Sequence, residues 1–254
     1  MEDTWEEVTR DEAVAQGDVA TAEVAAIDAV VVAEGAATRI IPIIDRYYAY
    51  LRGATFAEFT AIVAQYGSLL RSRYAETRVT PAQQNLVARY PDTLHVLALV
   101  AEGDPDTLAV LPIVARLLDS GPRLDLRILI DEESVAPLAQ LLPDVDVTAA
   151  LEEWDLPQFF CFDDDWELQG PWGPRPAAVE ERLEAWLASH PELIAEEETG
   201  ETPERDAALT QELVYAMRVW YNSGAAKACL EEWYELLLGL LPADDPAQTE
   251  EMSA

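Results

Sequence analysis

The chain contains two cysteines, Cys161 and Cys229, and these are the residue types best suited to covalent chemistry. They lie far apart in sequence, so they form neither a disulfide framework nor a metal-ligand cluster. Cys161 lies in the apolar run 158–162 among phenylalanines, which is typical of an inert core thiol. Cys229 lies on an expected helix, where a core or interface role is favoured over chemistry.

The histidines and the acidic clusters also favour structural roles. His95 alternates with apolar residues, His190 ends an expected helix, and neither has a second ligand at metal-binding spacing. The acidic run 163–165 lacks the glycine and the downstream glutamate of a calcium loop, which indicates a solvated turn. No phosphate loop, dinucleotide fingerprint or Ser-His-Asp arrangement is present. We therefore expect no metal site, no cofactor and no assigned catalytic residue.

The elements that would position these residues alternate between strands and helices. The nearly continuous apolar run 93–100 predicts a buried central strand. The order that follows is strand, helix, strand, helix, strand, strand and helix. After the first strand, the expected elements are a helix 106–119, a strand 124–130, a short helix 134–142, a hairpin of strands 158–162 and 166–170, and a helix 177–188.

Additional helices are expected on both sides of this core. Residues 55–58 form a capping-box pattern, and Thr80-Pro81 is a typical helix start. We expect an acidic, partly helical extension over 1–40, a domain with leading helices over 41–190, and C-terminal helices with an acidic tail over 191–254. The expected outer helices are 21–34, 38–51, 55–74, 80–90, 203–220 and a last helix ending near 240.

The charge of the chain is strongly negative. Asp and Glu number 49 against 16 Lys and Arg, for a formal net charge of -33, while half of the residues are hydrophobic. A disordered acidic chain would be poor in apolar residues, so this acid belongs to the surface of a folded protein. Adaptation to a salty cytoplasm is favoured over a specific basic partner. Without a basic stripe, nucleic acids and anionic membranes are disfavoured as ligands.

Cellular location follows from the N-terminus and from the hydropathy. Residues 1–7 are acidic where a secretory signal needs positive charge. The longest apolar stretch, 24–33, is interrupted by Asp28 and is too short to span a bilayer. These features predict a cytoplasmic protein.

The segment 102–112 resembles the active-site loop of thioredoxins and the helix that follows it. Pro112 matches the proline that kinks this helix in the family. A narrower group of bacterial thioredoxin family proteins, which carry a Trp-Cys-Gly-Asp loop, is more similar still. Their Trp-Gly-Pro-Arg-Pro hallmark stands here at 172–176, and Asp106 matches the aspartate of their loop. The C-terminal segments 220–224 and 231–232 also resemble theirs.

This resemblance implies an α/β fold of the three-layer thioredoxin type, with a mixed central sheet and extra helices at both ends. It also implies a cis peptide bond at Leu156-Pro157, facing the active-site loop. The degenerate active-site loop consists of Gly103, Asp104, Pro105, Asp106 and Thr107, and the cleft beside it would include Pro157, Trp172 and Arg175.

The resemblance fails at the residues that the family's chemistry needs. Asp104 stands in the position of the nucleophilic cysteine, Thr107 in that of the resolving cysteine and Gly103 in that of the tryptophan. A carboxylate cannot attack a disulfide to form a mixed disulfide. Asp104 either mimics a thiolate and holds a partner or caps the helix, and capping by Asp104 or Asp106 is favoured.

Trp172 and Arg175 have two interpretations. The tryptophan would either line the cleft or pack and stiffen a turn together with the flanking prolines. The arginine would then pair with an acid. The structural interpretation of the motif is favoured.

We therefore expect a catalytically inactive, thioredoxin-like binding or scaffolding module whose groove holds an extended peptide or a protein partner. One alternative is a residual monothiol oxidoreductase that uses Cys161. Another is a homodimer built by the terminal helices, with a vestigial groove.

Overall fold

The computed structural model describes residues 43–63, 65–130, 134–191 and 203–241. The expected helix 21–34, the N-terminal extension and the acidic tail lie outside these residues.

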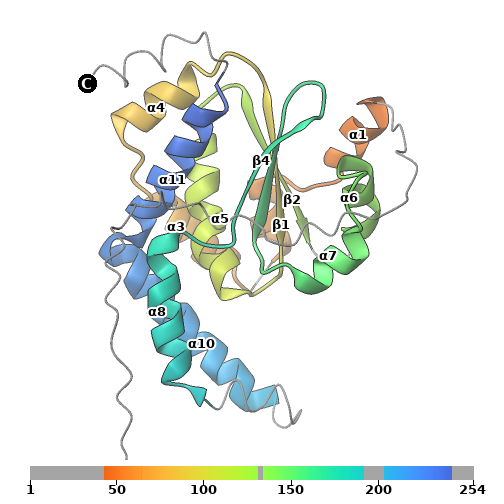
Figure 1. Cartoon of the computed structure of the whole chain (residues 1–254). Coiled ribbons are helices and arrows are strands. Elements are labelled where there is room, and N and C mark those ends of the chain that lie inside the picture. Colours follow the sequence, from red (N-terminus) through yellow and green to blue (C-terminus); the bar gives the residue numbers. More distant parts are fainter. Residues whose placement is uncertain (1–42, 64, 131–133, 192–202, 242–254) are drawn as a thin grey trace, which may run out of the picture.

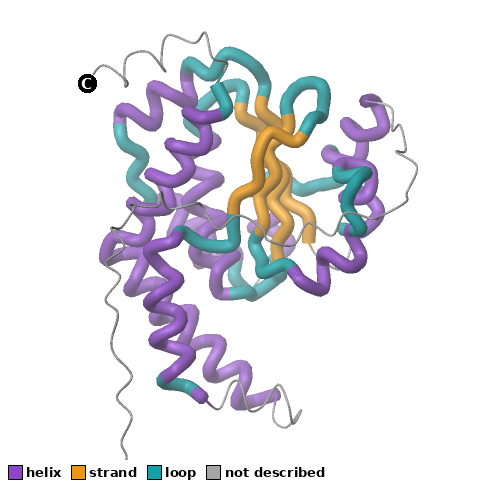
Figure 2. Tube along the Cα trace, in the orientation of Figure 1, coloured by secondary structure: helices purple, strands orange, loops and turns teal. Residues whose placement is uncertain are grey.

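Four strands form a mixed sheet at the centre of the molecule (Figure 2). Their order is β2-β1-β3-β4, and β1 pairs in parallel with β2 and antiparallel with β3. The connection from β1 to β2 therefore crosses over one face of the sheet through a helix, as parallel pairing requires. The strands are β1 Leu94–Val100, β2 Leu124–Ile130, β3 Gln158–Phe162 and β4 Leu168–Trp172.

β1 lies inside the sheet, between β2 and β3, and both of its faces are buried. Val96, Ala98 and Val100 belong to the hydrophobic cluster on one face of the sheet. Leu97 and Leu99 belong to the cluster on the other face. Alternate side chains of a strand point to opposite faces, so a continuous apolar run is what this position requires.

Helices cover both faces of the sheet and complete a three-layer fold (Figure 1). The smaller layer consists of α1 Ile43–Tyr50, α6 Val135–Leu141 and α7 Val147–Glu153. The larger layer consists of α2 Phe56–Ile62, α3 Gly67–Glu76, α4 Pro81–Ala88, α5 Pro105–Leu118, α8 Ala177–Ala188, α10 Pro203–Trp220 and α11 Ala226–Gly239. The predicted mixed sheet with extra helices at both ends is thus confirmed.

Several predicted helix starts are confirmed by their capping bonds. Thr55 and Glu58 form both hydrogen bonds of a capping box at the start of α2. Thr80 and Gln83 do the same at the start of α4, with Pro81 in its first turn. Among the described helices, none is both long and apolar enough to cross a bilayer.

The prediction of a single helix over 55–74 is wrong, because this segment forms two helices, α2 and α3. Val63 ends α2 outside helical geometry, and α3 begins at Gly67. A Cβ atom on Gly67 would lie 2.1 Å from the main-chain oxygen of Thr60. The break thus depends on a close backbone approach that only glycine allows, and helical periodicity does not encode it.

Two further elements differ from expectation. The returning strand of the hairpin spans Leu168–Trp172, two residues later than predicted, because Trp166 lies in the turn with φ 64°. Asp163 stabilises this turn by accepting hydrogen bonds from the main-chain N–H groups of Asp165 and Glu167. Helix α7 was not predicted at all, although Asp146 caps it.

The α2–α3 junction yields a stability prediction. Gly67→Ala should destabilise the protein by about 1–3 kcal/mol, because the new methyl group meets the Thr60 carbonyl. Gly239→Ala is the matched control: its Cβ atom would meet nothing within 4 Å, so stability should be unchanged or slightly higher. Urea unfolding of both variants measures the difference. Equal stability of the two variants would contradict the account of the junction.

Candidate functional site

The candidate site begins at the loop between β1 and α5. Gly103 has φ +85°, and a Cβ atom there would lie 3.0 Å from the Tyr66 ring. Asp104 is the N-cap of α5, and its carboxylate accepts a hydrogen bond from the main-chain N–H of Thr107 at 2.5 Å. Pro105 occupies the first turn, where its missing N–H costs nothing. The predicted capping role of Asp104 is confirmed.

Asp104 places a carboxyl group at the N-terminal end of α5. Burial raises the pKa of this carboxyl, and the Thr107 N–H and the Arg175 charge act in the opposite direction. The N-terminal end of a helix favours an anion through its free N–H groups and its dipole. The electrostatic setting of a thiolate is thus present, but the group within it cannot exchange disulfides.

Asp106 and Arg175 form the strongest polar contact of the site. The Arg175 Nε–H donates a hydrogen bond to Oδ2 of Asp106 at 2.8 Å, and Nη2 of Arg175 forms an ion pair with the same oxygen at 2.8 Å. Asp106 lies in the first turn of α5, and Arg175 lies between β4 and α8. Both side chains are largely removed from water. The pair therefore fixes the segment after β4 against the start of α5.

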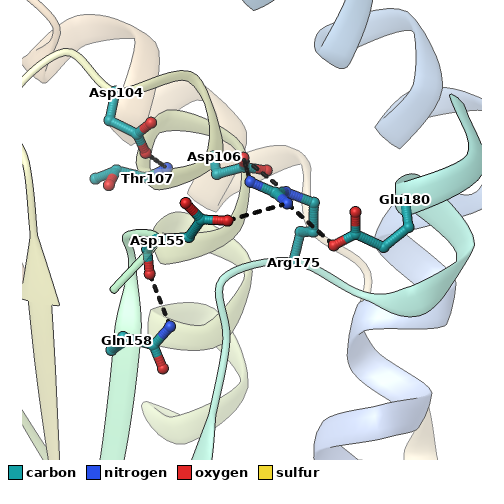
Figure 3. A network of polar contacts seen from close by, with 7 residues as sticks. All are labelled: Asp104, Asp106, Thr107, Asp155, Gln158, Arg175 and Glu180. Atoms are coloured by element: carbon teal, nitrogen blue, oxygen red, sulfur yellow. Dashed lines mark hydrogen bonds and ion pairs between the residues drawn. The ribbon is translucent and has the colours of Figure 1, made fainter. Parts of the chain in front are cut away.

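Two more acids surround the same guanidinium (Figure 3). Arg175 Nη1 lies 3.0 Å from Glu180 Oε1 and 3.8 Å from Asp155 Oδ2. Burial is the main cause that raises the pKa of Asp106 to about 7, and the charges of Asp104 and Glu180 add to it. Arg175 acts in the opposite direction, but one cation among four acids does not offset the burial. Asp106 thus titrates near neutral pH.

The site also contains buried polar atoms without partners. Among the described residues, Asp106 Oδ1, Thr107 Oγ1 and Gln158 Oε1 are buried and form no hydrogen bond. Buried polar atoms are normally paired with protein groups or ordered water. These atoms leave hydrogen-bonding capacity between the start of α5 and β3.

Pro157 lies at the start of β3, and the Leu156–Pro157 peptide bond is cis, as predicted. The Gly173–Pro174 bond is also cis. A Cβ atom on Gly173 would lie 2.3 Å from the Pro157 carbonyl oxygen. The 172–176 motif and the Pro157 segment are therefore packed backbone to backbone beside the α5 loop.

Trp172 does not join the other cleft residues. Its ring packs against Phe159 and Trp233, and its Nε1–H donates to Glu232 Oε2 at 3.1 Å. Within the described chain, no hydrogen bond, ion pair or ring contact links Trp172 to residues 103–107. Trp172 therefore anchors β4 to α11, which agrees with the packing role favoured for it.

Both cysteines are buried and therefore poorly suited to act as nucleophiles. Cys161 and Cys229 are each 0% exposed, and both belong to the core on the α5 side of the sheet. Burial raises the pKa of Cys161 to about 12 and raises the pKa of Cys229 well above its ordinary value. Neither thiol is available to water or to a substrate as a thiolate.

The histidines have aromatic partners rather than ligand sets. His95 stacks on Trp166 with centroids 4.5 Å apart, and His190 stacks on Trp186 at 4.0 Å. Among the residues that the structure describes, no three His, Cys, Asp or Glu side chains converge as metal ligands.

Sequence reasoning missed three contributors to this region. Asp155 and Glu180 share Arg175 with Asp106, and Glu232 accepts hydrogen bonds from Trp172 and from the Ala177 N–H. The sequence contains one signal for these contributors, because Glu180 lies in the first turn of the helix that follows the 172–176 motif. Asp155 and Glu232 are two of many acids in an acidic sequence, so composition conceals their roles.

The raised pKa of Asp106 predicts a specific dependence of stability on pH. Because this pKa is higher in the folded state, the folded protein binds the extra proton. The resulting stabilisation is full below about pH 4 and is lost as the pH rises through 7. The unfolding free energy of the wild type, relative to Asp106→Asn, should therefore fall by about 1–4 kcal/mol from pH 4 to pH 7. Urea unfolding of both proteins at each pH measures this difference in free energy. A difference that stays constant or rises with pH would contradict the raised pKa of Asp106.

Comparisons with known proteins agree with this geometry. The sequence profile of a family described as thioredoxin matches residues 53–188. A search of curated proteins finds no match to the chain.

Two solved structures share the fold. One is a protein of unknown function from Pseudomonas aeruginosa, 17% identical, with a TM-score of 0.50 over 75% of this chain and 95% of that chain. The other is an HIV epitope-scaffold, also 17% identical, with a TM-score of 0.50 over 76% of this chain and 97% of that chain. At this identity, both likenesses concern the fold alone. The family match covers more than half of the chain and includes the sheet, the α5 loop and the Pro157 segment, so the chain belongs to the thioredoxin family.

Proposed function

We propose that this protein is a catalytically inactive thioredoxin-like module that binds an extended segment of a protein or peptide partner beside the α5 loop. The observation that carries the proposal is the burial of both thiols, Cys161 and Cys229, at 0% exposure. Thiol–disulfide exchange requires an accessible thiolate, and the raised pKa values of both cysteines oppose its formation.

The loop before β3 supports a binding role. Among the described residues, the main chain of Leu156 forms no hydrogen bond, and its side chain is only half-buried. Main-chain groups that have no hydrogen-bond partner can pair with the main chain of an extended segment, as in β-strand addition. Asp155 is 75% exposed beside it, so a basic residue of the partner would find an acceptor there.

The surface charge supports a role in a high-salt cytoplasm. A net charge of -33 on a folded chain repels itself at low ionic strength and is screened at high ionic strength. The same charge opposes nucleic acids and anionic membranes as partners.

The monothiol alternative is disfavoured by the position of Cys161. Its strand pairs with β1 on one side and β4 on the other, and its side chain lies in the core. A substrate would have to part the sheet from the helices to reach the sulfur. The homodimer built by the terminal helices stays a prediction, which light scattering over a range of protein concentrations would test.

The binding proposal is tested with peptides selected from a random library on the full chain in molar potassium chloride. A selected peptide should shift the amide resonances of residues 103–107 and 155–158 in a ¹⁵N NMR titration. Asp155→Arg should weaken its binding by about 3- to 10-fold through the reversed charge. Asp165→Arg, an equal reversal on the exposed hairpin turn, should leave the affinity unchanged.

Three results would contradict the proposal. The first is that no peptide is retained. The second is that shifts are confined to other surfaces. The third is that Asp155→Arg and Asp165→Arg weaken binding equally, which would reduce the interaction to nonspecific attraction by an acidic surface.

A further inference from the structure

A cavity of about 310 Å³ lies on the helical side of the molecule, away from the α5 loop. Its walls are the end of α3, the start of α4, the middle of α5 and the start of α11. The π-helical segment Tyr221–Ala225, which joins α10 to α11, forms a further wall. Residues 103–107 do not line it, so the cavity is separate from the candidate site.

The local backbone at this cavity is irregular. Gly224 has φ +131°, which interrupts the helix between α10 and α11. The segment is therefore a kink between two helices, and the chain changes direction beside the cavity. A Cβ atom on Gly224 would meet nothing within 4 Å, so the residue borders open space rather than a packed core.

Arg73 on α3 lines this cavity and is 8% exposed. Among the described residues, its Nε, Nη1 and Nη2 atoms are all buried and have no hydrogen-bond partner. An unpaired buried charge is among the most costly features that a fold can contain. Asp and Glu outnumber Lys and Arg by 49 to 16, so a shortage of acids does not explain the missing partner.

Burial lowers the pKa of Arg73 to about 10, which leaves the guanidinium protonated at neutral pH. The nearby charge of Arg218 lowers this pKa as well, whereas Tyr221 and Glu76, both of which line the cavity, raise it. The Tyr221 hydroxyl is likewise buried without a partner among the described residues. A guanidinium and a hydroxyl that lack acceptors thus lie at the same cavity.

The other charged residues of the cavity leave the positive groups in excess. Lys227, the single lysine of the chain, pairs with Glu231 at 2.9 Å. Glu76 pairs with Arg218, which lies outside the lining, at 3.9 Å. Both lining acids are therefore engaged, whereas Arg73 has no ion pair within the described chain.

We propose that this cavity binds a small ligand through an oxyanion group, a carboxylate or a phosphate, that pairs with Arg73. The planar guanidinium presents its N–H groups as a fork that fits two oxygens of such a group. Within the described chain no hydrogen bond holds the end of the Arg73 side chain, and pairing with a ligand requires this end to turn toward the cavity. A cavity of 310 Å³ is at the small end of the ligand-site range, which favours a small metabolite. This site is independent of the proposed peptide surface.

The test uses the full chain and two probes, inorganic phosphate and acetate, each exchanged for chloride at constant ionic strength in molar potassium salt. Thermal unfolding and isothermal titration calorimetry are measured on the wild type, Arg73→Met and Arg89→Met. Arg89 is an exposed arginine outside the cavity and controls for the loss of one positive charge. Comparing the variants also separates site binding from the general stabilisation by phosphate.

At least one probe should bind saturably to the wild type and to Arg89→Met, and Arg73→Met should weaken that binding about tenfold or more. Binding by phosphate alone would assign a phosphoryl ligand, and binding by acetate alone would assign a carboxylate. Without probe, Arg73→Met should unfold at the same temperature as the wild type or higher, because it removes an unpaired buried charge.

The proposal is overturned if neither probe binds saturably. It is also overturned if both probes act equally on the wild type and on Arg73→Met. An Arg73→Met variant that fails to fold would overturn it as well, because Arg73 would then have a structural partner. Arg73→Lys, which keeps the charge and loses the planar fork, should fold and bind more weakly than the wild type.

Discussion

The candidate site depends on the ion pairs that the Arg175 guanidinium forms with the surrounding acids. It contacts Asp106 at the start of α5, Asp155 before β3 and Glu180 in α8, so one side chain connects three segments that are distant in sequence. Removing one member of a buried ion pair typically costs about 3–5 kcal/mol, because the other charge remains without a partner. The geometry of the α5 loop therefore depends on an arginine outside the loop.

The same loop carries a carboxyl group at the start of α5. The start of α5 still favours negative charge, and Asp104 places a carboxylate there that caps the helix. A reactive thiolate would have to be accessible, whereas both cysteines lie in the core. Among the described residues, the start of α5 thus carries a carboxyl group, and both thiols lie away from it in the core.

Two buried arginines show how differently the same residue is used. Arg175 is surrounded by acids that match its donors: burial lowers the pKa of its guanidinium, but the hydrogen bonds and charges of Asp106 and Glu180 raise it above its ordinary value. Arg73 is buried to a similar degree, yet among the described residues it has no acceptor. The contacts of Arg175 fit a structural and positioning role. The missing partner of Arg73 fits the proposal that a ligand binds beside it. Composition alone does not distinguish them, because both lie in a chain rich in acids.

Local signals predicted the parts of the fold that depend on local physics. The apolar run of β1, the capping boxes at Thr55 and Thr80, and the cap at Asp104 follow from side-chain type and spacing. The break before Gly67 does not, because it depends on the approach of a distant carbonyl in the folded state. The partners of Arg175 and the burial of Arg73 likewise depend on how separate helices pack, which a pattern along the chain does not contain.

The most direct test of the central claim is a disulfide-reductase and deglutathionylation assay in molar potassium chloride, with Cys161→Ser beside the wild type. The account predicts no turnover above background for either protein, because neither thiol can form an accessible thiolate. Turnover by the wild type that is lost in Cys161→Ser would contradict it and would make this protein a monothiol enzyme.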